Sequence, residues 1–180
     1  APDLRGEKAI VANAELMCIV VALADPPPRT GMIDRCLVAA YEAGMRPILC
    51  LTKTDLARPD ELLEAYRPFD VTTIVTSADD PDSVDELRRE LEGRFSVLVG
   101  HSGVGKSTLI NEVTGRGRHT STSSEAFELA GGGWIVDTPG VRSFGVGHVS
   151  VEDILSVFPE VGEATGCCLP LCSHSREEPS

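Results

Sequence analysis

The sequence predicts an α/β fold in which a doubly wound, mostly parallel sheet is covered by helices on both faces. Short apolar runs alternate with longer mixed stretches, which is the pattern of buried strands joined by helices. Polar motifs follow several of the apolar runs, as expected where ligands bind at the carboxyl ends of parallel strands. The chain has 180 residues, 42% of them hydrophobic, which is enough for the core of one such domain.

The first half of the chain contains three apolar-rich runs and a mixed stretch after each. The runs predict strands at residues 17–24, 47–51 and 71–76. The mixed stretches predict helices at residues 31–43, 59–67 and 84–91. Ser83 and Glu86 have the spacing of a capping box for the third helix. The prolines at 26–28 predict a stiff loop after the first strand, and we assign no chemistry to it.

The second half of the chain continues the alternation. Apolar runs predict strands at residues 94–100, 126–129 and 134–137, with a helix at 106–113. Three consecutive glycines at 131–133 predict a hairpin turn between the last two strands. An amphipathic stretch at 151–158 predicts a helix that links the sheet to the cysteine-rich tail.

A phosphate-binding loop is expected between the fourth strand and the fourth helix. Glycines at 103 and 105 permit backbone conformations in which successive N–H groups point at phosphate oxygens. Lys106 supplies a positive charge to the outer phosphates, and the Ser107 hydroxyl is placed to ligate Mg²⁺. With a strand before it and a helix after it, this motif predicts a P-loop NTPase. The expected nucleotide-binding residues of this phosphate loop are Gly100, His101, Ser102, Gly103, Val104, Gly105, Lys106, Ser107 and Thr108.

Two further loops predict that the base is guanine. The first base loop, residues 52–55, contains Thr52, Lys53 and Asp55. Its carboxylate can accept hydrogen bonds from guanine N1–H and the 2-amino group, whereas adenine has an acceptor at N1 and no such amine. The second base loop, residues 76–78, would direct a backbone N–H from Ser77 or Ala78 at guanine O6. Asn is commoner than Thr52 at its position, so we expect weaker bracing of the loop.

A fourth motif, residues 137–140, follows the last strand. Asp137 is expected to hold Mg²⁺ through water, and the Gly140 N–H to meet the terminal phosphate. Val141 stands where many GTPases have the glutamine that orients the attacking water, so intrinsic hydrolysis should be slow.

The best substitute for that glutamine is His119, in the segment where the first switch of a GTPase is expected. The alternative is that His119 is a solvated surface residue. Thr120 or Thr122 would supply the switch hydroxyl to Mg²⁺, with Thr120 taken here as the ligand beside Ser107 and Asp137. His119 and Lys106 are thus the candidate catalytic residues.

The first base loop precedes the phosphate loop, which is the reverse of their order in ordinary guanine-nucleotide switches. The chain is therefore predicted to be a circularly permuted GTPase. At this point it resembles the ribosome-dependent GTPases of small-subunit biogenesis, the RsgA or YjeQ family. The resemblance rests on residues 34–38, 52–55, 100–108, 115–120 and 137–140 and continues into the cysteine-rich tail.

The resemblance implies binding of GTP and GDP with Mg²⁺, and GTP hydrolysis stimulated by the 30S subunit during its late maturation, in contact with 16S rRNA. It also implies an N-terminal oligonucleotide-binding barrel, this GTPase domain and a C-terminal zinc domain. In this chain we expect no barrel, with residues 1–148 expected to form the GTPase domain and 149–180 a linker helix and the start of the zinc domain. The resemblance makes Cys167, Cys172 and His174 zinc ligands, with a fourth cysteine expected just past Ser180.

The stretch between Asn111 and Gly115 is distinctly shorter than in relatives. That stretch normally finishes the phosphate-loop helix and begins the first switch. We therefore expect residues to be missing from the middle of this sequence.

Composition agrees with a cytoplasmic enzyme domain, and we expect it to be a monomer. A net charge of -12 argues against broad RNA adhesion through this domain; Arg116, Arg118 and His119 are a local basic exception that either contacts rRNA or pairs with nearby anions. Cys18, Cys36 and Cys50 lie in or beside apolar runs and are expected to be buried free thiols. No apolar run approaches the roughly eighteen residues needed to cross a membrane.

Three functions are compatible with these motifs. The first is a GTP-hydrolysing ribosome-assembly factor. The second is a non-hydrolysing guanine-nucleotide switch that recruits partners by nucleotide state, which Val141 permits. The third is an ATP-using P-loop enzyme, which the two base loops disfavour.

Overall fold

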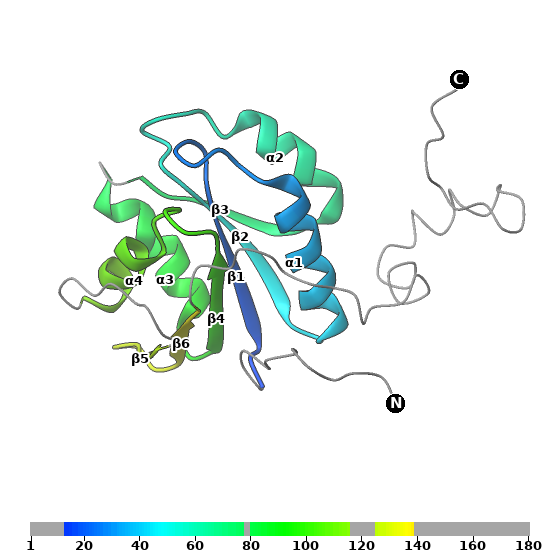
Figure 1. The fold of residues 1–180 in the computed structure, drawn as a ribbon. Coiled ribbons are helices and arrows are strands. Elements are labelled where there is room, and N and C mark those ends of the chain that lie inside the picture. The colour runs from blue at the N-terminus through cyan, green and yellow to red at the C-terminus, as the bar shows by residue number, and fades with distance from the viewer. Residues whose placement is uncertain (1–12, 78–79, 116–124, 139–180) are drawn as a thin grey trace, which may run out of the picture. The chain divides into compact units, whose positions relative to one another are not determined.

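A six-stranded sheet forms the centre of the structure, a computed structural model that describes residues 13–77, 80–115 and 125–138 (Figure 1). The strand order is β3-β2-β1-β4-β6-β5. All neighbouring strands are parallel except β5 and β6, which are antiparallel. The strands are β1 (Leu16–Ala22), β2 (Arg46–Thr52), β3 (Thr72–Val75), β4 (Phe95–Gly100), β5 (Glu125–Glu128) and β6 (Trp134–Asp137). The predicted doubly wound, mostly parallel sheet is confirmed.

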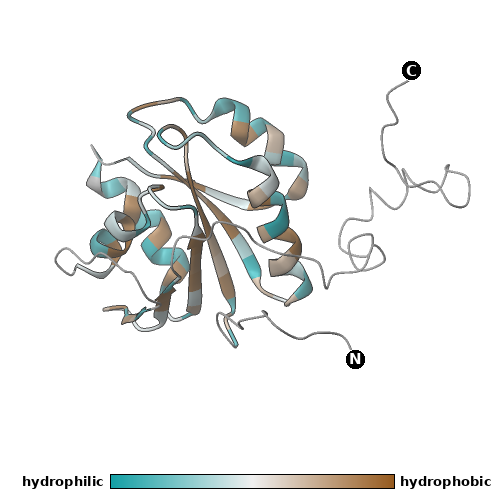
Figure 2. Ribbon diagram, viewed as in Figure 1, coloured by the Kyte–Doolittle hydropathy of each residue, from teal (hydrophilic) through white to brown (hydrophobic). Residues whose placement is uncertain are grey.

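Helices cover both faces of the sheet. They are α1 (Thr30–Glu42), α2 (Asp60–Tyr66), α3 (Asp85–Leu91) and α4 (Lys106–Thr114), with short 3-10 turns η1 (Arg67–Phe69) and η2 (Pro81–Val84). One apolar cluster joins α1 and α2 to the sheet, and a second joins α3, α4 and the β5–β6 hairpin to its other face. The two clusters take alternate residues of β1, whose seven residues are all buried. A strand covered on both faces in this way has to be apolar throughout, and Figure 2 shows this contrast with the mixed helices.

Each predicted strand and helix within the described residues has a counterpart within a few positions. The hairpin turn is also present, because the Leu129 N–H donates to the Gly133 carbonyl. The capping box is wrong: α3 begins after Val84 with no side-chain cap, and the Ser83 hydroxyl bonds elsewhere. Cys18, Cys36 and Cys50 are buried free thiols, as predicted. Burial raises the pKa of Cys36 to about 12.

The chain divides into two units, Ala1–Val146 and Gly147–Ser180, and all the described residues belong to the first. Within the described residues, no helix is both long enough and apolar enough to cross a membrane. The predicted helix at 151–158 and the cysteine-rich tail lie outside the described ranges.

Candidate nucleotide site

The carboxyl ends of β2, β4 and β6 bring three separate motifs to one edge of the sheet. In the sheet register, Val20 of β1 pairs with both Cys50 of β2 and Gly100 of β4. On the other side of β4, Leu98 pairs with Asp137 of β6. The first base loop, the phosphate loop and the Asp137 motif therefore start side by side, although 85 positions separate Thr52 from Asp137 in the chain.

The phosphate loop connects β4 to α4, and glycine is required in it for two different physical reasons. Gly103 and Gly105 have φ angles of 83° and 92°, in the left-handed region that favours glycine. Gly100 instead packs too closely for a side chain, because a Cβ there would lie 2.7 Å from the Val20 carbonyl oxygen. The loop leads directly into α4, whose N-terminus adds the positive end of a helix dipole.

Lys106 and Asp137 form a buried ion pair at the centre of the site. The Lys106 Nζ donates to Asp137 Oδ1 at 2.7 Å and also to the Thr138 carbonyl. The two side chains are only 8% and 2% exposed. Thr138 is itself held by β4, since its hydroxyl donates to the Leu98 carbonyl at 2.7 Å. The chain leaving β6 is therefore fixed against the strand that leads into the phosphate loop.

A cavity of about 380 Å³ opens beside this ion pair. It is walled by the phosphate loop, the start of α4, one residue of the first base loop and one residue of β6. The lining residues are Lys53, His101, Ser102, Gly103, Gly105, Lys106, Ser107, Thr108 and Asp137. The structure thus brings together most of the residues predicted to hold the phosphates and Mg²⁺.

A smaller cavity of about 130 Å³ continues from the first toward the base loops. The two cavities share Lys53, Gly105 and Thr108. Thr52, Thr76 and Ser77 complete its base-loop side, and Leu109 and Glu112 of α4 complete the other side. Residues of the second base loop and of the phosphate loop therefore line the same cavity.

Three threonines hold the loops of this site in place. The buried Thr52 hydroxyl donates to the Val104 carbonyl in the phosphate loop at 2.6 Å. The Thr54 hydroxyl donates to the Thr76 carbonyl at 3.1 Å and so joins the two base loops. Thr76 in turn donates to the Leu51 carbonyl through both its N–H, at 2.8 Å, and its hydroxyl, at 3.2 Å.

The loop after β1, to which the sequence assigned no chemistry, lies against the site. The Lys53 Nζ donates to the Asp25 carbonyl, so the lysine stem bridges from the first base loop to this loop. Pro26 lies beside the phosphate loop, where a Cβ built on Gly103 would be 3.6 Å from its Cδ. The only sequence signal for this placement is that β1 ends at the same sheet edge as β2 and β4.

Asp55 lies in a turn closed by a hydrogen bond from the Leu56 N–H to the Lys53 carbonyl, at 3.0 Å. Its side chain is exposed and does not line either cavity. Its contact with the base stays a prediction.

Several predicted site residues lie outside the described ranges, and their roles stay predictions. They are Ala78, His119, Thr120, Thr122, Gly140, Cys167, Cys172 and His174. In the part of the chain that is described, no group of three or more His, Cys, Asp or Glu residues could hold a metal ion.

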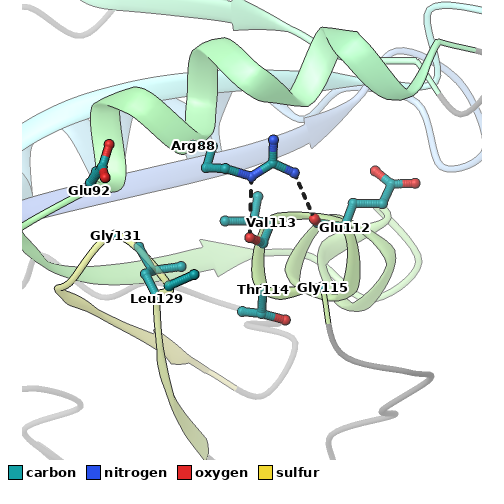
Figure 3. Close-up of a pocket in the computed structure, with 9 residues that line it drawn as sticks. Arg88, Glu92, Glu112, Val113, Thr114, Gly115, Leu129 and Gly131 are labelled. Atoms are coloured by element: carbon teal, nitrogen blue, oxygen red, sulfur yellow. Dashed lines mark hydrogen bonds between the residues drawn. The ribbon is translucent and has the colours of Figure 1, made fainter.

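A third cavity, of about 240 Å³, lies away from these motifs, between α3, the end of α4 and the β5–β6 hairpin (Figure 3). On its α3 side, the Arg88 guanidinium donates to the carbonyls of Glu112, at 2.9 Å, and Val113, at 3.4 Å (Figure 3). These are carbonyls of the last turn of α4, which have no partner within the helix. Arg88 thus ties α3 to the end of the helix that begins at the phosphate loop.

Comparison with known proteins agrees with this architecture. The family model described as RsgA GTPase matches residues 1–147. The chain is 40% identical over 198 aligned positions to the small ribosomal subunit biogenesis GTPase RsgA of Ectopseudomonas mendocina (strain ymp), covering 98% of this chain and 57% of that protein. The protein of the same name from Pseudomonas aeruginosa (strain LESB58) is 41% identical, with coverage of 98% and 58%.

Two solved structures are also similar. The crystal structure of YjeQ from Thermotoga maritima superposes with a TM-score of 0.74 at 30% identity, covering 93% of this chain and 62% of that one. YloQ, described as a circularly permuted GTPase, superposes with a TM-score of 0.70 at 28% identity, covering 92% and 58%. The predicted circular permutation of the fold is confirmed.

The chain spans less than three fifths of the length of these curated relatives. The alignments also run over 198 positions, more than the 180 residues of this chain, so the relatives carry residues that have no counterpart here. The shortening expected after Asn111 is consistent with this and stays a prediction. On the family match and these identities, the chain belongs to the RsgA GTPase family.

Proposed function

We propose that this chain is the nucleotide-hydrolysing domain of a small-subunit biogenesis factor, which converts GTP to GDP and phosphate. The observation that carries the proposal is the hydrogen bond from the Thr52 hydroxyl to the Val104 carbonyl. This bond joins the first base loop, which is proposed to bind guanine, to the phosphate loop. One nucleotide can therefore contact both loops. Both relatives are small ribosomal subunit biogenesis GTPases by name, which supports this biological setting.

The proposed chemistry divides the nucleotide between the two cavities. Backbone N–H groups of the phosphate loop and the Lys106 ammonium would bind the phosphates, and the base loops would bind guanine. Asp137 and Ser107 line the same cavity and present a carboxylate and a hydroxyl, which are hard oxygen donors of the kind Mg²⁺ prefers. Bound there, Mg²⁺ would neutralise charge on the outer phosphates.

The attacking water needs a polar residue to orient it, and Val141 cannot provide one. We assign this role to His119, which a ribosomal partner would bring into place. His119→Ala should lower the stimulated rate of GTP hydrolysis by about a hundredfold or more and leave the affinity for GDP unchanged. An equal loss of GDP affinity would instead make His119 a binding residue.

We further propose the 30S subunit and its 16S rRNA as partners, and hence a cytoplasmic location. We also propose that the protein acts as a monomer. Cys167, Cys172 and His174 are proposed zinc ligands, for which zinc requires a fourth. Zinc content measured on the full-length protein and on a Cys167→Ser, Cys172→Ser double variant tests this assignment.

Single-turnover hydrolysis of radiolabelled GTP by the full-length protein tests the main proposal. We expect slow hydrolysis alone, clear acceleration by 30S subunits, and none by 50S subunits. Lys106→Ala should abolish the signal in both conditions. Tight GTP binding without acceleration by 30S subunits would favour the alternative, a non-hydrolysing guanine-nucleotide switch.

A further inference from the structure

The strand β5 lies at an edge of the sheet, and within the described residues only β6 pairs with it. Glu128 of β5 stands opposite Trp134 of β6, whose N–H donates to the Arg94 carbonyl on the β4 side, at 2.8 Å. Glu128 and Trp134 are therefore a pair without hydrogen bonds between them, and such pairs alternate with bonded ones along an antiparallel ladder. The N–H and carbonyl groups of Glu128 and Ala126 accordingly point outward, away from β6.

One face of the β5–β6 hairpin lies outside both apolar clusters of the described residues. Phe127 and Ile135 belong to the cluster that packs under α3 and α4, and side chains alternate between the two faces of a strand. Ala126, Glu128 and Trp134 therefore lie on the opposite face. The helices α1 and α2 cover that face farther along the sheet (Figure 1), but their cluster includes no described residue of β5 or β6.

This face combines an exposed aromatic ring with negative charge. Trp134 is 43% exposed, although large apolar side chains elsewhere in the described ranges are mostly buried. Glu128, directly opposite, is exposed, as are Ala126 and Glu125. A Lys or Arg side chain from another molecule could contact the Glu128 carboxylate and the face of the indole ring together, since both attract a cation. None of these four residues lines either nucleotide cavity.

We propose that the β5 surface, defined by Glu125, Ala126, Glu128 and Trp134, binds an extended segment of a protein partner that carries Lys or Arg and adds to β5 as a further strand. The outward N–H and carbonyl groups of Ala126 and Glu128 supply the backbone hydrogen bonds, and alternate side chains of the segment lie over Trp134 and Glu128. Nucleic acid fits poorly, because its phosphates would meet carboxylates. A second copy of the chain, with a net charge of -12, fits poorly for the same reason.

The probe is a fluorescein-labelled peptide of eight residues in which Lys and Val alternate, and its binding to the full-length protein is followed by fluorescence polarisation. The matched control peptide has the same sequence with every backbone nitrogen methylated, which keeps the charge and removes the backbone donors. We expect the control peptide to bind at least about tenfold more weakly, because several hydrogen bonds are lost. Equal affinities for the two peptides would overturn the proposal, since charge alone would then explain the binding.

Two variants locate the peptide on β5. Glu128→Gln removes one charge and should weaken binding of the parent peptide by about three- to fivefold, as for loss of one ion pair. Glu86→Gln makes the same change of charge at an exposed position of α3 and should leave the affinity unchanged. Ala126→Pro removes one outward N–H, which an edge strand tolerates, and should weaken binding by about fivefold or more. Equal weakening by Glu86→Gln and Glu128→Gln would overturn the proposal.

If Ala126→Pro does not fold, amide hydrogen exchange of the wild-type protein decides the question. The parent peptide should slow exchange at the Ala126 and Glu128 amides, which point outward. Exchange at Phe127, whose N–H faces β6, should be nearly unchanged. Saturating peptide that leaves Ala126 and Glu128 unprotected would show that no strand is added there.

Two other occupants would give different results. If a twelve-nucleotide oligouridine displaces the peptide, the β5 surface is a nucleic-acid site. If wild type sediments as a dimer and Ala126→Pro as a monomer, β5 is an interface between copies of this chain. Either result overturns the proposal.

Discussion

The hydroxyl of Thr52, the last residue of β2, donates to the carbonyl of Val104, which lies 52 positions later in the phosphate loop. The bond is 2.6 Å long and buried. Parallel strands end at the same edge of the sheet whatever their order in the chain. A permuted chain order therefore still yields one site, in which this bond joins the first base loop to the phosphate loop.

Thr52→Val keeps the shape of this residue and removes the hydroxyl. The Val104 carbonyl would lose its donor, so the free energy of unfolding should fall by about 1–2 kcal/mol. Affinity for GDP and ADP should fall together, because the phosphate loop itself is loosened. Urea unfolding and calorimetry check both effects, with Thr73→Val as the control. A selective loss of GDP affinity alone would contradict this account.

Replacing Lys106 by Met would leave the buried Asp137 carboxylate without its cation. Breaking a buried pair in this way costs about 3 kcal/mol or more of unfolding free energy. The double variant Lys106→Met, Asp137→Asn should recover most of that stability, because no uncompensated charge remains. Neither variant should bind nucleotide. A double variant no more stable than the single one would show that the pair is not what holds this region together.

Ser96 of β4 is fully buried, and its hydroxyl has no hydrogen-bond partner among the described residues. Ser96→Ala should therefore raise the free energy of unfolding, by about 1 kcal/mol. The contrasting variant is Thr138→Val, which removes a buried hydroxyl that does have a partner and should destabilise. The urea midpoints of the two variants should shift in opposite directions. If Ser96→Ala is destabilising, the Ser96 hydroxyl does have a hydrogen-bond partner, and this account is wrong.

Burial raises the pKa of Cys36 to about 12, from an ordinary value of 9.0. The native thiol keeps its proton at a pH where the unfolded thiol loses it. Its contribution to stability is thus fully present below pH 9 and is lost as the pH rises from 9 to about 12. Urea unfolding should show that wild type loses about 1 kcal/mol more than Cys36→Ala between pH 8 and pH 10. Equal losses would mean that this thiol does not remain protonated.

The strands, helices and phosphate loop were predictable because their signals are local. Continuous apolar runs such as 17–24 indicate strands covered on both faces, and the spacing of Gly100, Gly105 and Lys106 indicates a phosphate loop. These patterns depend on residue type and position alone, so they need no knowledge of the packing.

The hydrogen bonds that join separate segments were not predictable, and the reason is physical. Ser83 has two possible sets of partners, the start of α3 or the second base loop, and only the packing of α3 on the sheet decides between them. Lys53 bonds a backbone carbonyl at Asp25, and Arg88 bonds carbonyls at the end of α4. A carbonyl is present at every residue and therefore leaves no mark in a sequence.

Asp55 is proposed to bind guanine next to the phosphate loop, although its exposed side chain lines neither of the two cavities described above. The most direct test is the ratio of GDP to XDP affinity, measured by calorimetry on wild type and Asp55→Asn. Xanthine has a carbonyl where guanine has its 2-amino group, so an amide at position 55 should donate to it. We expect wild type to prefer GDP strongly and Asp55→Asn to prefer XDP. An unchanged preference for GDP in Asp55→Asn would contradict the claim.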